Sequence, residues 1–79
     1  MLVINEGFKL TTYPENENKL MDILDAFDVA ITDKRYMYNY QISKEPVRLV
    51  LECHIRDSEY AEFVDYLRNH FDGWISLVE

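Results

Sequence analysis

Apolar residues recur along this chain with a period that switches back and forth between two values. They fall on alternate positions in residues 2–10 and 47–56, which is typical of half-buried strands. They recur every three or four residues in 17–28 and 57–71, which is typical of amphipathic helices. Residues 35–42 and 74–79 fit two further strands, and the first of these could begin as early as Val29 with an interruption near Asp33 and Lys34. The predicted order is therefore strand, helix, strand, strand, helix, strand.

This order predicts the architecture. Each helix is long enough to cross back over a sheet, and right-handed crossovers then give a ferredoxin-like βαββαβ arrangement. We expect an α+β fold in which both helices cover one face of a four-stranded antiparallel sheet. With 79 residues, the chain is expected to form a single ferredoxin-like domain over residues 1–79. The same fold hosts many unrelated functions, so it predicts no activity by itself.

Turn residues predict where the elements begin and end. Asn16 and Asn18 are the candidates to cap the first helix, because their side-chain oxygens can accept hydrogen bonds from free N–H groups. Gly73 is expected to close the second helix in the left-handed conformation. Gly7 is expected either to mark a bulge in the first strand or to turn that strand into a small hairpin.

The stretch RYMYNYQI, residues 35–42, has tyrosine at every second position. A hairpin loop at 43–46 predicts the following cross-strand pairs: Ile42 with Val47, Tyr40 with Leu49, Tyr38 with Leu51, and Tyr36 with Cys53. This register places the tyrosines on the apolar side of the third strand, so we expect them in the core. A slip of one residue would instead expose them as a stacking surface.

Charge is unevenly distributed among the predicted elements. The two helical regions, 15–28 and 57–72, hold ten acidic residues against Lys19 and Arg68. The remaining residues hold five acidic and six basic residues, although the whole chain carries −7. Two helices on one sheet face lie about 10 Å apart, close to the Debye length of roughly 8 Å at physiological salt. We therefore expect their outer faces to act partly as one negative field.

Composition excludes several classes of function. A net charge of −7 argues against a duplex DNA binder. The first residues lack the features of a secretory signal and no apolar run is long enough to span a membrane, so we expect a soluble, cytoplasmic protein. The single cysteine, Cys53, is expected to be a packed core thiol. His54 and His70 lack a metal-binding spacing. We expect no catalytic residue, no metal and no cofactor.

Several families that share the fold carry signatures that this chain lacks. Heavy-metal-associated domains carry two cysteines in the first loop, and acylphosphatases carry a phosphate-binding arginine there, but residues 13–19 contain neither. RNA-recognition motifs stack bases on the open sheet face, where the third strand offers only Val50, Glu52 and His54. ACT-like regulatory domains resemble the chain in size and topology, without their glycine-containing first loop.

A protein-interaction role remains after these exclusions. We expect a small, non-enzymatic inhibitor or adaptor that places helical carboxylates in a basic groove of a nucleic-acid-binding protein. The predicted partner-binding residues are Glu15, Glu17, Asp22, Asp25, Glu62 and Asp65. Small phage-encoded anti-defence proteins of the anti-CRISPR type resemble the chain in size, acidity and lack of motifs. The alternatives are an ACT-like regulatory domain that dimerises through its open sheet face and binds a small ligand, and a single-stranded nucleic-acid binder that uses the tyrosines.

Overall fold

The structure, a computed structural model, describes residues 4–79 and confirms the predicted element order. The elements are β1 (Asn5–Thr12), a 3-10 turn η1 (Pro14–Asn16), α1 (Glu17–Ala26), β2 (Ala30–Tyr38), β3 (Pro46–Arg56), α2 (Asp57–His70) and β4 (Ile75–Val78). Leu2 and Val3, which the alternation places in the first strand, lie outside the described residues. Within 4–79, no helix has the length and hydropathy needed to cross a bilayer.

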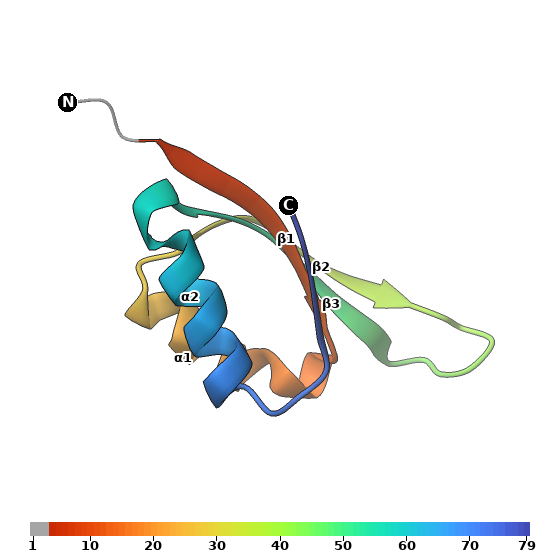
Figure 1. The fold of residues 1–79 in the computed structure, drawn as a ribbon. Helices are drawn as coiled ribbons and strands as arrows, with labels where there is room; N and C mark the ends of the chain where they lie inside the picture. The colour runs from red at the N-terminus through yellow and green to blue at the C-terminus, as the bar shows by residue number, and fades with distance from the viewer. Residues whose placement is uncertain (1–3) are drawn as a thin grey trace.

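The four strands form one antiparallel sheet in the order β2-β3-β1-β4. The two central strands, β3 and β1, come from the cleanest alternating stretches of the sequence. Both helices lie on the same side of this sheet, and the other face is open (Figure 1). This is the predicted ferredoxin-like α+β fold.

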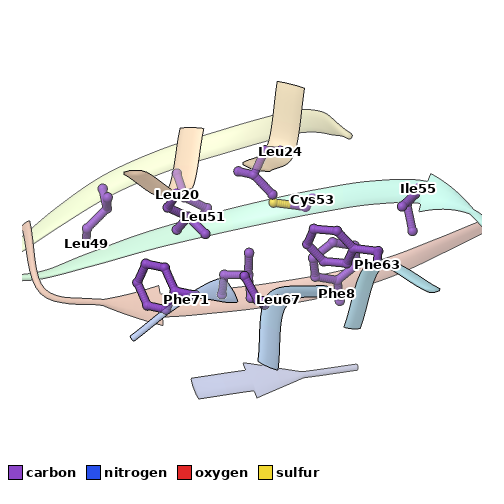
Figure 2. Close-up of a cluster of buried hydrophobic side chains, with 11 residues drawn as sticks. Phe8, Leu20, Leu24, Leu49, Leu51, Cys53, Ile55, Phe63, Leu67 and Phe71 are labelled. Atoms are coloured by element: carbon purple, nitrogen blue, oxygen red, sulfur yellow. The ribbon is translucent and has the colours of Figure 1, made fainter. Parts of the chain in front are cut away.

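A core of leucine and phenylalanine side chains fills the space between the sheet and the helices (Figure 2). The sheet contributes alternate residues of β1 and β3, among them Leu10 and Leu51, which are fully buried. The helices contribute Leu20, Leu24, Phe63 and Leu67. Because residues from α1 and α2 meet the same side of β3, the polar side of each helix must face away from the sheet.

The two glycines have other roles than those predicted. Gly7 pairs with His54 in an uninterrupted β1–β3 register, so it marks neither a bulge nor a hairpin. Gly73 does not have a positive φ, and α2 ends three residues earlier. A Cβ at position 73 would lie 2.6 Å from the Asn16 Nδ2 atom, so the close approach of η1 explains this glycine. The positive φ of the described chain occurs at Asp28, after α1.

The start of α1 also differs from the prediction. Asn16 occupies the N-cap position, but its side chain makes no capping hydrogen bond. Its Nδ2 instead donates to the Thr12 hydroxyl at 3.2 Å, and that hydroxyl donates to the Trp74 carbonyl at 2.6 Å. This chain of bonds ties the end of β1 to the segment before β4, and Thr12 is fully buried.

The predicted tyrosine register is wrong. Tyr36 pairs with Leu49 and Tyr38 pairs with Pro46, and Tyr40 lies in the loop 39–45. Strand β2 ends at Tyr38, so the hairpin loop spans 39–45 instead of the predicted 43–46, and this shifts the pairing of Tyr36 by four residues. The irregularity at 37/38 adds one more residue at Tyr38. Tyr36 still lies on the helix-bearing side, opposite buried Leu49, but beyond the cover of the helices. The tyrosines are therefore exposed, not core residues.

The β2–β3 hairpin projects past the end of the helical layer (Figure 1). It gives the molecule its elongated shape, with principal extents of 50 × 24 × 18 Å. We name residues 34–48 the hairpin arm. Large side chains are exposed along it: Tyr36, Met37, Tyr38, Tyr40 and Ile42. The Tyr38 and Tyr40 rings stack on each other with centroids 5.5 Å apart and an interplanar angle of 7°.

Candidate functional site

Carboxylates cover the outer side of the helical layer. Asp22 and Asp25 are exposed on α1, on the side opposite buried Leu20 and Leu24. On α2, Glu62 and Asp65 are exposed on the side opposite buried Phe63 and Leu67. Glu15, in η1, is exposed at the start of the layer. We name these five residues the carboxylate face: Glu15, Asp22, Asp25, Glu62 and Asp65.

Lys19 and Arg56, two cations near the helices, pair with acids outside the carboxylate face. Lys19 pairs with Asp72 at 3.4 Å, and Arg56 pairs with Glu59 at 3.7 Å. Among residues 4–79, no member of the carboxylate face has a cationic nitrogen within 4.0 Å. These carboxylates therefore keep their charge directed at solvent, where a partner's cations can approach them.

The structure separates Glu17 from the other predicted site residues. Its side chain points toward β2, where it accepts hydrogen bonds from the Tyr36 hydroxyl and from Lys34 Nζ, the latter at 2.9 Å. These two hydrogen bonds hold the pKa of the Glu17 carboxyl below its ordinary value. Glu17 thus ties the first turn of α1 to the base of the hairpin arm and has little capacity left for a partner.

The Glu17 contacts predict a pH-dependent contribution to stability. Because its pKa is lowered in the folded state, the stabilisation is complete above the ordinary value of 4.5 and is lost as the pH falls through the folded pKa. We expect Glu17→Gln to reduce the free energy of unfolding by about 1–2 kcal/mol at neutral pH. The free energies of unfolding of the wild type and of the variant should become equal at acidic pH. Urea titrations at several pH values test this, with Asp22→Asn as control; a pH-independent difference would contradict it.

The open sheet face carries charges that largely compensate one another. The Arg35 guanidinium lies 2.9 Å from an Asp33 carboxylate oxygen and 4.0 Å from a Glu52 oxygen. Toward one end of this face, Arg48 lies over the rings of Tyr13 and Trp74, at 4.9 and 5.2 Å from their centroids. Such cation–π contacts position the arginine and both aromatic rings. The sequence gives no local sign of this cluster, since its members are far apart along the chain.

The histidines and the cysteine lie in separate surroundings: His54 is exposed and Cys53 buried on β3, and His70 is exposed on α2. Within the described residues, no cluster of three His, Cys, Asp or Glu side chains has the arrangement of a metal site. His70 stacks on Tyr66, and its Nδ1 lies 3.0 Å from the Tyr66 carbonyl oxygen. Cys53 is only 1% exposed, which confirms the packed thiol, and burial raises its pKa to about 11.

Burial of Cys53 predicts slow thiol chemistry. Raising the pKa from 9.0 to about 11 lowers the thiolate fraction at neutral pH by about 100-fold, because the thiolate is the nucleophile. We expect native protein to react with a disulfide reagent at least about 100-fold more slowly than urea-unfolded protein. Equal rates in the two states would contradict the buried position.

An apolar groove lies between α2 and β4, at the edge of the sheet. We name it the edge groove; its volume is about 920 Å³. Its floor and walls include half-buried Val64, Ile75 and Leu77 together with Phe71, and its rim carries Asp65 and Arg68. Ile75 pairs with Thr12, and Leu77 pairs with Leu10. Thr12 and Leu10 are buried beneath the helices, and residues paired across strands share a face, so Ile75 and Leu77 face the groove.

Comparison with known proteins identifies the fold alone. No known protein family matches the chain, and no curated protein matches it. A solved structure described as a putative PII-like signaling protein from Thermus thermophilus is similar, with a TM-score of 0.61 and 11% sequence identity. The similarity covers 99% of this chain and 91% of the other. At this identity it supports the ferredoxin-like fold and carries no residue-level function.

Proposed function

We propose that this chain is a non-enzymatic protein-interaction module whose carboxylate face binds a basic surface. The observation that supports it is the position of the five carboxylates, four on α1 and α2 and Glu15 on η1 just before α1, which lack ion-pair partners among residues 4–79. Neighbouring like charges at a surface raise the local concentration of a cationic partner and speed its association.

The partner that fits this surface is a Lys- or Arg-lined groove of a nucleic-acid-binding protein. A row of carboxylates presents negative charges to such a groove much as phosphates do, so the module would act as an inhibitor or adaptor of the anti-CRISPR type. Glu17 has no direct role in this proposal, because Tyr36 and Lys34 already occupy its carboxylate.

Salt dependence of binding tests the proposal. The probe is a short arginine-rich peptide, titrated by calorimetry while the Debye length falls from roughly 30 to 8 Å with added salt. We expect the affinity to fall steeply over this range, because the contacts are between exposed charges. An affinity independent of salt would contradict the role of the carboxylate face.

A second candidate function uses the hairpin arm. Residues 34–48 hold Lys34, Arg35, Lys44 and Arg48 against Glu45, which is a net charge of +3 on an otherwise acidic chain. The stacked Tyr38 and Tyr40 rings are exposed on the same arm, and Lys34 lies 5.6 Å from the centroid of the Tyr36 ring. Cations interleaved with exposed aromatic rings are typical of surfaces that bind single-stranded nucleic acid. We therefore propose a single-stranded oligonucleotide as the alternative ligand of the molecule.

Fluorescence titration with an oligonucleotide distinguishes binding by the hairpin arm from binding by the carboxylate face. Adding a single-stranded oligonucleotide should quench the tyrosine emission, and Tyr40→Ala should weaken binding by roughly 5- to 100-fold, as expected for loss of one stacked base. Ile42→Ala, which removes an equally exposed apolar side chain, is the matched control. Unchanged emission at saturating oligonucleotide would exclude the arm as a nucleic-acid surface.

The regulatory alternative has less support from the geometry. An ACT-like domain would dimerise through the open sheet face, and the similar solved structure is described as a signaling protein. The β2–β3 part of that face, however, carries the ion pairs of Arg35 with Asp33 and Glu52. Stable interfaces have an apolar centre from which charged residues are depleted. Dimerisation through the open face and binding of a small ligand stay predictions.

A further inference from the structure

The two edges of the sheet differ in how they are protected against pairing with another strand. Strand β2 carries Asp33, Lys34 and Arg35 and contains register irregularities. Charged side chains and bulges at an edge discourage edge-to-edge association. Strand β4, at the opposite edge, reads Ile75-Ser76-Leu77-Val78 and contains no charge. Its backbone is therefore the better template for a further strand.

From this contrast we propose that the chain forms a homodimer in which β4 pairs antiparallel with β4 of a second copy, with Ser76 on the two-fold axis. This register places Ile75 opposite Leu77 of the partner on the groove side, and Trp74 opposite Val78 of the partner on the open side. Within residues 74–78, every cross-strand pair is then apolar or a Ser–Ser pair. Trp74 and Val78 are 45% and 58% exposed in the single chain, so the pairing would cover apolar surface.

The edge groove supports a second copy as the occupant. A two-fold axis perpendicular to the sheet keeps all helices on one face, so α2 of each copy flanks the groove of the other. The groove rim carries both an acid, Asp65, and a base, Arg68. A two-fold axis brings the same surface of the second copy to this rim, so opposite charges are available for pairing across it. A stable dimer buries at least roughly 1,000 Å², so the four-residue ladder must be supplemented by the groove.

This proposal shares only Asp65 with the carboxylate face, and the opposite responses to salt distinguish dimerisation from peptide binding. Two copies together carry −14, twice the −7 of one chain, so their association is opposed by long-range repulsion. Added salt screens that repulsion and should strengthen the dimer, whereas binding of a cationic peptide to the carboxylate face should weaken.

The test is the solution mass of the full chain by light scattering, at increasing protein concentration and at physiological salt. We expect twice the 9.5 kDa of one chain. Val78→Glu should restore the monomer, because a carboxylate would be buried against Trp74 of the partner. Within one chain, the new side chain would lie beside Lys9 on the neighbouring strand β1, so it should not disturb folding. Circular dichroism checks that the variant is folded. Ile42→Glu adds the same charge at an exposed apolar site on the hairpin arm and should remain dimeric.

Cysteine cross-linking tests the register without relying on a disruptive substitution. In the proposed dimer the two Ser76 residues face each other, within the Cα separation of roughly 4.4–6.8 Å that a disulfide usually spans. Ser76→Cys should therefore form a covalent dimer under mild oxidation, and Leu77→Cys should not. Cys53 is buried and does not compete. Three results would each overturn the proposal. The first is a monomeric mass at all concentrations. The second is dissociation by Ile42→Glu and not by Val78→Glu, and the third is preferential cross-linking of Leu77→Cys.

Discussion

Replacing Phe63 with alanine is expected to reduce the free energy of unfolding by about 3–5 kcal/mol, the usual cost of removing a buried phenylalanine ring. Phe63 is fully buried, and its ring packs at 5.4 Å from the rings of both Phe8 and Phe27. It therefore joins α2 to β1 and to the end of α1. Since a small domain has roughly 5–15 kcal/mol of stability in total, the variant should be partly unfolded near body temperature.

Thermal and urea unfolding followed by circular dichroism measure this effect. Tyr40→Ala is the control, because the ring is 74% exposed and its removal should change the free energy of unfolding by no more than about 0.5 kcal/mol. Equal reductions in the free energy of unfolding for Phe63→Ala and Tyr40→Ala would contradict a core centred between the helices and the sheet. They would also contradict the exposed position of the hairpin arm.

Neutralising four helical carboxylates is expected to weaken binding of an arginine-rich peptide by on the order of 100-fold at low salt, from roughly 0.2–1 kcal/mol for each exposed charge contact. The variant combines Asp22→Asn, Asp25→Asn, Glu62→Gln and Asp65→Asn, which changes the net charge from −7 to −3. All four side chains are exposed, so we expect the fold to be retained.

A charge-matched variant separates position from net charge. It combines Glu6→Gln, Asp33→Asn, Glu45→Gln and Glu79→Gln, which also gives −3 but leaves the carboxylate face intact. We expect this variant to bind the peptide within a few-fold of the wild type, because its lost charges lie outside the helical layer. Equal losses in the two variants would mean that overall acidity alone, without a defined surface, accounts for binding.

The fold was predictable from the sequence because its central strands and both helices have clear periodicity. Alternation in residues 47–56 reflects the burial of one side of β3, and the apolar stripes of the helices match their buried residues. The tyrosine register failed because Tyr40 and Ile42 continue the apolar alternation past the end of β2 at Tyr38, so the loop was predicted at 43–46 instead of 39–45. The start of β2 was also unmarked, because its first half, from Ala30 to Arg35, is largely polar.

The roles of Gly73 and Glu17 were not predictable, because both depend on segments distant in the chain. Gly73 lies against the Asn16 side chain, and Glu17 is held by two residues of β2. The carboxylate face was more accessible to sequence reasoning. Helical spacing places Asp22 and Asp25, like Glu62 and Asp65, opposite the apolar stripe, so their exposure follows from the same pattern that predicts the helices.

Mapping the peptide contact by nuclear magnetic resonance tests the central claim most directly, and a chain of 9.5 kDa is well suited to the method. Titration of isotope-labelled protein with the arginine-rich peptide should shift backbone amide signals along the outer sides of α1 and α2, around Asp22, Asp25, Glu62 and Asp65. Signals of the hairpin arm and of β4 should stay in place. Shifts confined to the arm or to β4, with the helical signals unchanged, would contradict a binding surface formed by the helical carboxylates.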